Sequence, residues 1–567
     1  MCLSDQRWCE LINYETTAEL GSLTSIKRLI AHHVSTPERF CSSWPEQKCS
    51  SDADFAIAEA MAIKGDRILA VGDEATVRKA AGPEVTIVDL KGNVVLPGFI
   101  DAHIHPLAGA ASQAFENVGV DRFRSVEDAL DYMKKTAAEA TGADWHLFIN
   151  LDLATQSYAE AKLTTEVLDA ISNKTPVAVW HAGGHRMTVN SRLLEIMGVT
   201  AGTPNPPGAE YGRYLDGTPD GNVAGSAALF AALGKIRPYA NYNRKAGAIA
   251  LARKWMSEGM TTLGIAGVTT PADWKVLLDL ASNPAFSMRT RSYLQWGALP
   301  LWDEAGVKPG VGNAKVRVIG WKISTDGSNQ AYTGLQREPY LNREDSGLPY
   351  MTQADIDRAV AEGTKRGGQM AMHGNGDAAI DNIITAVASA RVQGIDVVRP
   401  RIEHCSIVQD DQIPKLKKNE ISCSFLIAHV LYWGRAFRDK AFGPQKAVKL
   451  DRAGSFERAG IPFSLHTDYA VSVLSPLEMV EVAVTRTLFT EPDFVLGPSE
   501  RASIEAAIRS VTSVPAWQLM SEKEIGSLEA GKLADFAVLA ADPLEVEPSQ
   551  IGEIQVLETW IDGERVR

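Results

Sequence analysis

The chain is predicted to fold into a (β/α)8 TIM barrel, a closed ring of eight parallel strands covered by helices. From residue 94 onward, short apolar runs alternate with segments long enough for helices, a pattern typical of parallel α/β domains. Eight strand–helix units can be counted in this alternation, and eight units close a barrel. Several of the apolar runs end in His, Lys or Asp, and barrels of this class place their chemistry at the C-terminal ends of the strands.

The first strand is predicted from the apolar run 94–105, which ends in His103 and His105. The composition of this run indicates a buried strand. The other seven strands are predicted, in order, at 261–266, 290–296, 316–323, 369–373, 401–404, 421–426 and 462–468. Helices are predicted at 243–258, 272–281, 353–366, 378–392, 411–418 and 455–459.

A long stretch between the first two barrel strands does not follow this alternation. Residues 138–237 contain a strand candidate of their own at 176–180 and a loop at 202–208 that is dense in Gly and Pro. We interpret the stretch as a large insertion. Because it follows a C-terminal strand end, it can cover the barrel mouth. The alternative is a surface excursion without function.

The two chain ends resemble each other in style. Two short strands joined at a Gly-Asp turn are predicted within 58–72, and further short strands at 534–539 and 556–566. They suggest one small β-sandwich built from both ends. The predicted organisation is therefore an N-terminal extension at 1–51, sandwich parts at 52–97 and 521–567, and a barrel at 98–520 that contains the insertion.

Composition limits the classes of partner. The 567 residues carry a formal net charge of −13, which disfavours nucleic acid and anionic membrane surfaces as partners. No apolar stretch approaches the roughly 20 residues that span a bilayer, and the N-terminus lacks the form of a signal peptide. We therefore expect a small-molecule substrate, a cytoplasmic location and, as the default for a soluble enzyme, a homodimer.

Cysteines do not indicate a structural metal site. The extension holds four of the six, and their spacing differs from that of a zinc ribbon or finger: Cys2, Cys9, Cys41 and Cys49. Cys405 and Cys423 lie in apolar runs and are expected in the core.

The residues at the strand ends form a candidate metal site. Side chains alternate along a strand, so His103 and His105 project to the same side and can bind one divalent metal. The ends of the fourth, fifth, sixth and eighth strands, which converge with the first in a closed barrel, carry Lys322, His373, His404 and Asp468. Four imidazoles and a carboxylate suit zinc or another first-row divalent ion.

Several segments resemble a known family. The run 97–105 is similar to the first-strand motif of the amidohydrolase superfamily, and 526–536 is typical of its closing segment. The runs 322–328, 373–377 and 401–404 resemble the amidohydrolase type 3 branch, which includes N-substituted formamide deformylases. The resemblance implies one metal on His103, His105 and Asp468, a second on His373 and His404, and a carboxylated Lys322 that bridges the two.

Lys322 also has an argument of its own. A free ammonium beside two dications would be strongly repelled, so the side chain should be modified or displaced. The alternative is an ion pair with Asp326, which would leave a site for a single metal. The sequence leaves open whether one metal or two are bound.

The chemistry expected from such a site is hydrolysis of a carbon–nitrogen bond other than a peptide bond. A metal lowers the pKa of its bound water to about 7, and Asp468 would accept the proton and pass it to the leaving nitrogen. A linear amide, an N-acyl or N-formyl amine, is the substrate class we expect. The alternatives are a deaminase or cyclic-amide hydrolase on the same fold, and a catalytically silent metal-binding barrel.

Further residues are candidates for contacts around the metal. The resemblance places His185 near the substrate, and a capping or packing role is its alternative. His429 and Trp433 could form one wall of the pocket, although a place in the core suits Trp433 equally well. His466 is expected to hold a ligand by a hydrogen bond. No phosphate-binding loop and no Gly-x-Ser-x-Gly elbow occurs, which argues against a serine hydrolase.

Overall fold

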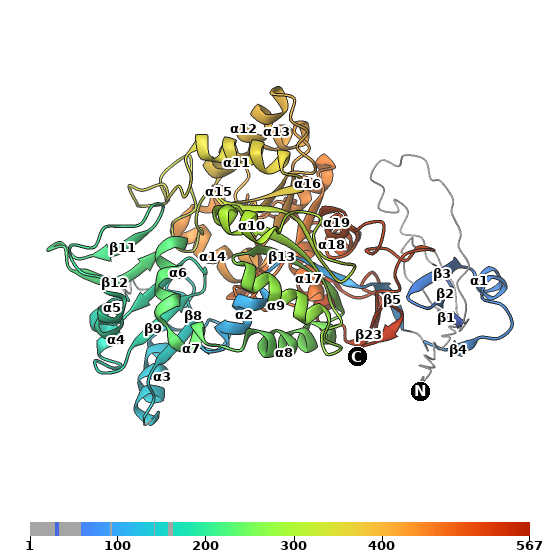
Figure 1. Ribbon diagram of the computed structural model, residues 1–567, viewed down its shortest axis with the longest axis horizontal. Coiled ribbons are helices and arrows are strands. Elements are labelled where there is room, and N and C mark those ends of the chain that lie inside the picture. The colour runs from blue at the N-terminus through green and yellow to red at the C-terminus, as the bar shows by residue number, and fades with distance from the viewer. Residues whose placement is uncertain (1–28, 33–57, 91–92, 141, 157–162) are drawn as a thin grey trace.

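The computed structural model describes residues 29–32, 58–90, 93–140, 142–156 and 163–567 (Figure 1). Its centre is a parallel sheet of eight strands in the order β19-β18-β17-β16-β15-β14-β13-β6. The sheet curls until its two edges meet, where the amide of Asp468 donates to the carbonyl of His103 at 3.0 Å. The predicted barrel is confirmed. The strands are β6 (Phe99–Ile104), β13 (Met260–Val268), β14 (Arg289–Gln295), β15 (Val316–Ser324), β16 (Gln369–Gly374), β17 (Arg401–His404), β18 (Ser422–Phe425) and β19 (Phe463–Leu465).

Helices cover the outside of this ring. Their starts follow side-chain capping: Thr270 accepts a hydrogen bond from the amide of Asp273 at 3.1 Å, and Thr352 does the same for Asp355 at 3.2 Å. The predicted helices are found as α8 (Arg244–Ser257), α9 (Pro271–Ala281), α11 (Gln353–Lys365), α12 (Asp377–Val392), α13 (Ile413–Lys418) and α16 (Ala453–Ala459). Others are α2 (Pro106–Ser112), α10 (Leu299–Ala305), α14 (Gly434–Ala436), α15 (Pro444–Ala447), α17 (Pro476–Thr485), α18 (Ile504–Arg509) and α19 (Ser513–Gln518). Helix α3 (Val126–Glu139) packs instead on a second sheet, formed between β6 and β13.

The predicted first strand is wrong in one respect, because the run 94–105 forms two strands. β5 (Val94–Pro97) pairs with β22 (Phe536–Leu539) outside the barrel, and only β6 belongs to the ring. The chain changes sheets at Gly98, whose amide donates to the carbonyl of Asp535 at 3.0 Å. A Cβ there would lie 2.3 Å from Thr261 Cγ2, so the close approach requires glycine.

The stretch between β6 and β13 builds a second sheet, which we call the cap. Its strand order is β11-β12-β10-β9-β8-β7, and apolar clusters pack on both of its faces. The sheet begins at β7, before residue 138. The cap strands are β7 (Glu116–Asn117), β8 (His146–Leu151), β9 (Val177–His181), β10 (Arg186–Val189), β11 (Glu210–Arg213) and β12 (Pro219–Ala224). Its helices are α4 (Thr165–Asp169), α5 (Ser191–Met197), α6 (Ser226–Lys235) and α7 (Arg237–Ala240).

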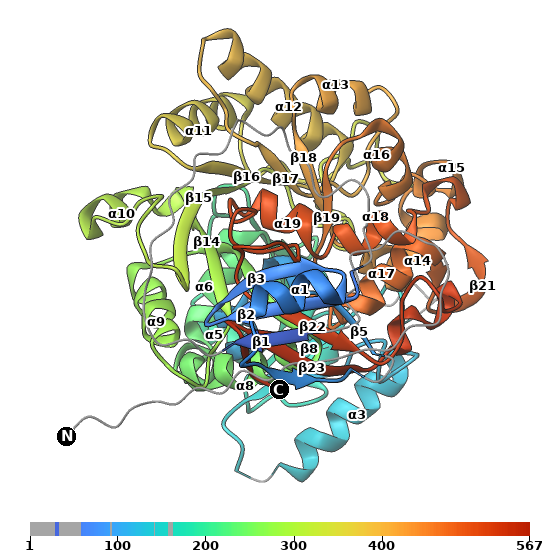
Figure 2. The same cartoon turned by 90° about the vertical axis from the view of Figure 1, so that its right-hand side faces the viewer.

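Segments from both chain ends lie at the opposite side of the barrel from the cap (Figures 1 and 2). Two four-stranded sheets, β3-β2-β1-β4 and β24-β23-β22-β5, share one apolar cluster that includes Ile63, Val95 and Phe536. The amide of Ile68 also donates to the carbonyl of Lys532 at 2.8 Å. Their elements are β1 (Leu29–His32), β2 (Ala60–Lys64), β3 (Arg67–Gly72), α1 (Glu74–Ala81), β4 (Thr86–Val88), β23 (Val556–Ile561) and β24 (Glu564–Arg565).

The predictions for the N-terminal extension and for the cysteines have different outcomes. The extension at 1–51 and its four cysteines lie outside the described residues, except for β1. Cys405 and Cys423 are fully buried, as predicted.

A short hairpin, β20 (Thr487–Leu488) and β21 (Glu491–Val495), flanks the barrel. Among the described residues, no helix combines the length and the apolar character that a bilayer crossing needs.

Candidate metal centre

The C-terminal ends of the barrel strands bring the predicted ligands together. Asp468, just after β19, faces two imidazoles that end β6: its Oδ1 lies 3.4 Å from His103 Nε2 and 3.2 Å from His105 Nε2. Its Oδ2 lies 3.9 Å from His404 Nε2 at the end of β17. The ring of His373, on β16, is 4.5 Å from that of His404 between centroids. Residues separated by as many as 365 positions therefore surround one small volume at the barrel mouth.

Two of these residues have an unusual backbone conformation. His404 has a φ of 67° and Asp468 a φ of 51°, in the left-handed region that residues other than glycine rarely adopt. Such a conformation costs about 1–3 kcal/mol, which the surrounding structure must offset. The next amide, that of Cys405, donates to Gly374 at 3.0 Å and holds the turn at the end of β17. Both strands thus end in a sharp turn that presents a polar side chain to the mouth.

His103 is held from behind by a buried charge pair. Its Nδ1 lies 2.6 Å from Glu403 Oε2, and Arg401 Nε donates to Glu403 Oε1 at 2.6 Å. Burial alone would raise the pKa of Glu403, but Arg401 and His103 hold it well below its usual value. An ionised Glu403 accepts the Nδ1 proton, and this leaves the Nε2 lone pair of His103 directed at Asp468.

Sequence reasoning missed Glu403 and Arg401 as functional residues. A signal was present, because β17 is only four residues long and fully buried, yet carries two charged side chains two positions apart. Such side chains lie on one face of the strand and require partners in the core. Arg401, Glu403 and the imidazole of His103 serve as one another's charge and hydrogen-bond partners.

The imidazoles of the centre have electron pairs available for a cation. Burial lowers the pKa of His105, and it lowers those of His373, His404 and His466 well below the usual value. They are therefore neutral at pH 7. Two sets of donor atoms lie within 4.8 Å of one another, one on His103, His105 and Asp468 and one on His103, His404 and His466. Neutral imidazole nitrogen with one carboxylate fits a divalent transition metal.

Lys322 lies near the end of β15, 3% exposed, and the alternative of an ion pair with Asp326 does not occur. Among the described residues, none hydrogen-bonds to its amine or pairs with it. Burial lowers the pKa of Lys322 to about 8, although Glu403 and Asp468 act in the opposite direction. An amine of this kind spends more time unprotonated than a surface lysine does.

Asp326 instead organises the loops around the mouth. Its carboxylate accepts hydrogen bonds from the amides of Leu335 and Gly376, each at 2.9 Å. Its Oδ1 also lies 3.4 Å from His373 Nε2. Asp326 thus joins the loop that follows β15 to the one that follows β16.

His466 and His185 both lie beside the centre, but they come from different parts of the fold. His466 is fully buried, stacks on His103 with centroids 4.6 Å apart, and places its Nε2 3.3 Å from His404 Nδ1. His185 comes from the cap, directly before β10, and its ring centroid is 5.2 Å from that of His373. Its Nδ1 is 3.3 Å from the hydroxyl of Tyr350. The cap therefore supplies one imidazole to the mouth.

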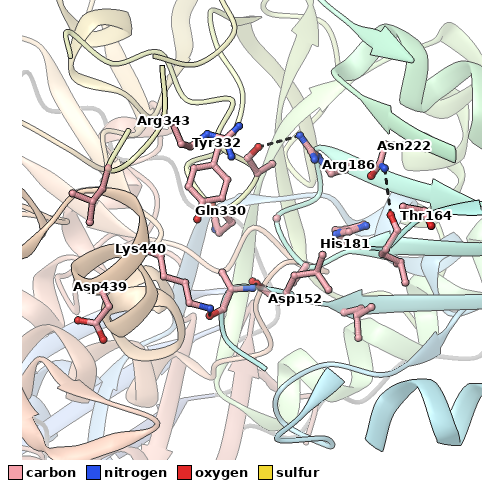
Figure 3. Close-up of a pocket in the computed structure, with 18 of the residues that line it drawn as sticks. Asp152, Thr164, His181, Arg186, Asn222, Gln330, Tyr332, Arg343, Asp439 and Lys440 are labelled. Atoms are coloured by element: carbon pink, nitrogen blue, oxygen red, sulfur yellow. Dashed lines mark hydrogen bonds between the residues drawn. The ribbon is translucent and has the colours of Figure 1, made fainter. Parts of the chain in front are cut away.

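His429 and Trp433 lie further back, on a π-helical turn (His429–Trp433) after β18. His429 is buried, with its Nδ1 3.2 Å from Ser406 Oγ and its ring 6.5 Å from that of His404. The Trp433 indole is also buried and donates to Asp152 of the cap. Asp152 lines a pocket of about 700 Å³ between the cap and the barrel loops (Figure 3). Sequence reasoning did not identify this pocket, because loops far apart in the chain form it.

Comparisons with known proteins agree with this architecture. The N-substituted formamide deformylase of Arthrobacter pascens is 27% identical over 544 residues, which cover 90% of this chain and 95% of that protein. The protein LONG AFTER FAR-RED 3 of Arabidopsis thaliana is 28% identical, over 91% and 90% of the two chains. A metal-dependent hydrolase from Pyrococcus horikoshii OT3 shares the fold with a TM-score of 0.66 and 22% identity, over 86% of this chain and 94% of that one.

The family assignment follows from a longer match. Residues 86–567 match the sequence model of the amidohydrolase family, well over half of the chain. This confirms the resemblance noted in the first-strand and closing motifs. The chain belongs to the amidohydrolase family and is a hydrolase of carbon–nitrogen bonds other than peptide bonds.

Proposed function

We propose that this protein is a metal-dependent hydrolase of a linear amide, an N-acyl or N-formyl amine. The observation that carries the proposal is the convergence of His103, His105, His404 and His373 around Asp468, whose carboxylate oxygens lie 3.2–3.9 Å from the nearest nitrogens of the first three. The similarity to an N-substituted formamide deformylase supports a linear amide, but 27% identity does not name the substrate.

The metal would be zinc or a related divalent ion, because neutral imidazole and carboxylate are the donors present. His103, His105 and Asp468 would hold one ion, and His373 and His404 a second. Lys322, carboxylated on its Nζ, would bridge the two. Its burial, its lowered pKa and its lack of a partner among the described residues support this role. Bound here, the metal lowers the pKa of water and polarises the substrate carbonyl.

Asp468 is the proton carrier in this proposal. Burial alone would raise its pKa, but His103 and His105 hold it well below the usual value, so the carboxylate is ionised and can accept a proton. It takes a proton from the attacking water as the water oxygen bonds to the carbonyl carbon, and then transfers that proton to the amide nitrogen. The carbon–nitrogen bond breaks, and the products are a carboxylic acid and an amine.

Other residues keep this geometry. Glu403 fixes which nitrogen of His103 is protonated, and His466 supports His404 through its Nδ1. His185 of the cap donates a hydrogen bond to the substrate carbonyl in this proposal, which is supported by the 5.2 Å between its ring centroid and that of His373. His429 and Trp433 shape the wall behind these groups.

The experiment measures metal content and hydrolysis together. Purified protein is analysed for metal, stripped with a chelator, reloaded with Zn²⁺, and assayed on N-formyl amines, N-acyl amines, cyclic amides, aminopurines and esters. We expect bound metal and a loss of linear-amide hydrolysis on stripping that Zn²⁺ restores. Turnover of cyclic amides or aminopurines alone would favour the cyclic-amide hydrolase or the deaminase. Tight metal without any turnover would favour a silent barrel.

We also propose that the protein acts in the cytoplasm as a homodimer, on a small molecule rather than on nucleic acid or a membrane. The net charge of −13 supports a small-molecule substrate over nucleic acid or a membrane surface. Light scattering on the eluted protein tests the dimer, and a monomer at micromolar concentration would contradict it.

A further inference from the structure

The pocket between the cap and the barrel is the part of the molecule that the proposed chemistry does not use. One wall comes from the ends of β8 and β9, and the facing wall from the loops that follow β15 and β18 (Figure 3). The segment His181–Gly183 lines it, and His185, two residues further on, faces the metal centre. The cap segment 181–186 thus contributes residues both to the pocket and to the surroundings of the metal centre.

Arg186 is one of three cationic side chains that line this pocket, with Arg343 and Lys440. Its Nη2 donates to the carbonyl of Ala331 at 3.3 Å, while its Nε is buried and without any hydrogen bond (Figure 3). No carboxylate forms an ion pair with it among the residues that the structure describes. A guanidinium keeps its charge even where burial lowers its pKa, so Arg186 is a half-buried cation whose Nε–H group has no acceptor.

The carboxylates of the pocket are engaged elsewhere. Asp152 accepts from the Trp433 indole and from the amide of Ala154 at 2.7 Å. Asp220 accepts from the amide of Asn222 at 2.8 Å, and Asp439 pairs with Arg438 at 2.6 Å. None of the three forms an ion pair with Arg186. Glu210 of β11 and Asp220 still act on it from a longer range and oppose the lowering of its pKa by burial.

A second cation lies near Arg186. The Arg343 guanidinium stacks over Tyr332, 4.5 Å from the ring centroid, and its positive charge acts on Arg186. Arg343 has a counter-ion of its own, because its Nε is 2.9 Å from Asp345 Oδ2. Arg343 therefore has a carboxylate partner, whereas Arg186 forms no ion pair within the part of the chain that the structure describes.

We propose that this pocket binds an acid group of the substrate, with Arg186 as its anchor. The inference rests on the proposed function and narrows it: the substrate is an amide that carries a carboxylate or a similar anion beside the bond that is cleaved. The planar fork of a guanidinium matches a carboxylate and can bind both of its oxygens. The neighbouring His185 directs the other end of the molecule toward the metal centre.

The experiment compares pairs of substrates that differ only in charge. N-formyl and N-acetyl derivatives of a neutral amino acid are assayed beside the matching primary carboxamides, with Zn²⁺-loaded protein. Wild type should prefer the acids by about 10- to 100-fold in kcat/KM, the size of a hydrogen-bonded charge contact. Arg186→Gln should remove the preference by raising KM for the acids, with KM for the carboxamides unchanged within about twofold.

Two controls separate recognition from folding. Arg186→Lys keeps the charge without the fork and should retain part of the preference. Arg192→Gln alters an exposed cap arginine that pairs with Glu195 at 2.6 Å, and should behave as wild type. If Arg186→Gln lowered turnover of acids and carboxamides equally, Arg186 would be a structural contact between cap and barrel, and the inference would be wrong.

A binding measurement distinguishes this inference from the proposed function. Calorimetry on Asp468→Asn protein, in which turnover is blocked, should show the acids binding more tightly than the carboxamides, and Arg186→Gln should abolish the difference. If no amide is hydrolysed by wild type but the acids still bind through Arg186, the proposed function fails and the pocket stands. If wild type hydrolyses amides but shows no preference for acids, the proposed function stands and the inference about Arg186 is wrong.

Discussion

The barrel mouth and the cap pocket are neighbours, yet they are built differently. At the mouth, the candidate metal ligands stand at or just after strand ends, and His103 is held by buried partners, between Glu403 and Asp468. In the pocket, the walls are loops from several segments, and Arg186 keeps a donor without a partner. A rigid, mutually satisfied centre suits one type of reaction, whereas loops with unused donors suit the selection of a substrate.

Removing the carboxylate of Asp468 at the barrel mouth should have the largest effect, on turnover. We expect Asp468→Asn to retain much of the metal but to lower kcat by about 100- to 10,000-fold, because the proton carrier is lost. Asparagine tolerates the φ of 51° at this position, so the backbone should persist. Elemental analysis and steady-state kinetics measure the two quantities. Asp410→Asn, at an exposed pair with Lys449, is the control, and an active Asp468→Asn protein would refute the role.

Removing the carboxylate that holds His103 should have the next largest effect, on metal affinity. Glu403→Gln removes the charge that fixes the imidazole, and we expect metal affinity to fall by about 10- to 100-fold. Titration calorimetry with Zn²⁺ on stripped protein provides the measurement. Glu522→Gln breaks a similar pair, with Arg399 at 2.9 Å, but on the outside of the barrel, and should leave metal affinity unchanged. Equal affinities for wild type and Glu403→Gln would show that the mouth does not depend on its buried partners.

The tightness of packing should also differ between the barrel and the cap, and glycine-to-alanine substitutions measure the difference. In Gly98→Ala the new methyl would meet Thr261 Cγ2 at 2.3 Å where the chain enters the barrel, and we expect a loss of about 1–3 kcal/mol in the free energy of unfolding. Gly234→Ala, in cap helix α6, meets nothing within 4 Å and should be neutral or stabilising. Denaturant unfolding of both variants measures this. Similar losses in the two would mean that the junction is no tighter than the cap.

The smallest effect concerns Glu258, a partly buried carboxyl outside both regions. Burial raises the pKa of Glu258 to about 7; Lys254, 3.9 Å away, opposes the rise and Glu478 adds to it. A raised pKa means that the folded state holds the proton more tightly, so stability falls as pH rises from 4.5 towards 7. Glu258→Gln should therefore gain about 1 kcal/mol relative to wild type at pH 8 and nothing at pH 4. Thermal unfolding at the two pH values tests this, and a gain at pH 4 would contradict it.

The strand order and the candidate ligands could be predicted because each barrel strand is a local apolar run with its polar residue at one end. The runs ending at His373 and His404 are examples, and the structure places both residues at the mouth. The break at Gly98 could not be predicted, since β5 and β6 are continuous in composition and only the close approach of Thr261 separates them. The sequence allows Asp326 as an ion-pair partner of Lys322, but in the structure its carboxylate accepts hydrogen bonds from the amides of Leu335 and Gly376 instead.

The sequence by itself determined the alternation of strands and helices and the identity of the donors at the strand ends, because periodicity and side-chain chemistry are local properties. The tertiary structure alone decided which donors face one another, that Glu403 supports His103, and that Arg186 opens into a pocket without a counter-ion. These features depend on distances between segments hundreds of residues apart. Such distances are set by the closure of the barrel and by the way the cap packs on it, which no local pattern records.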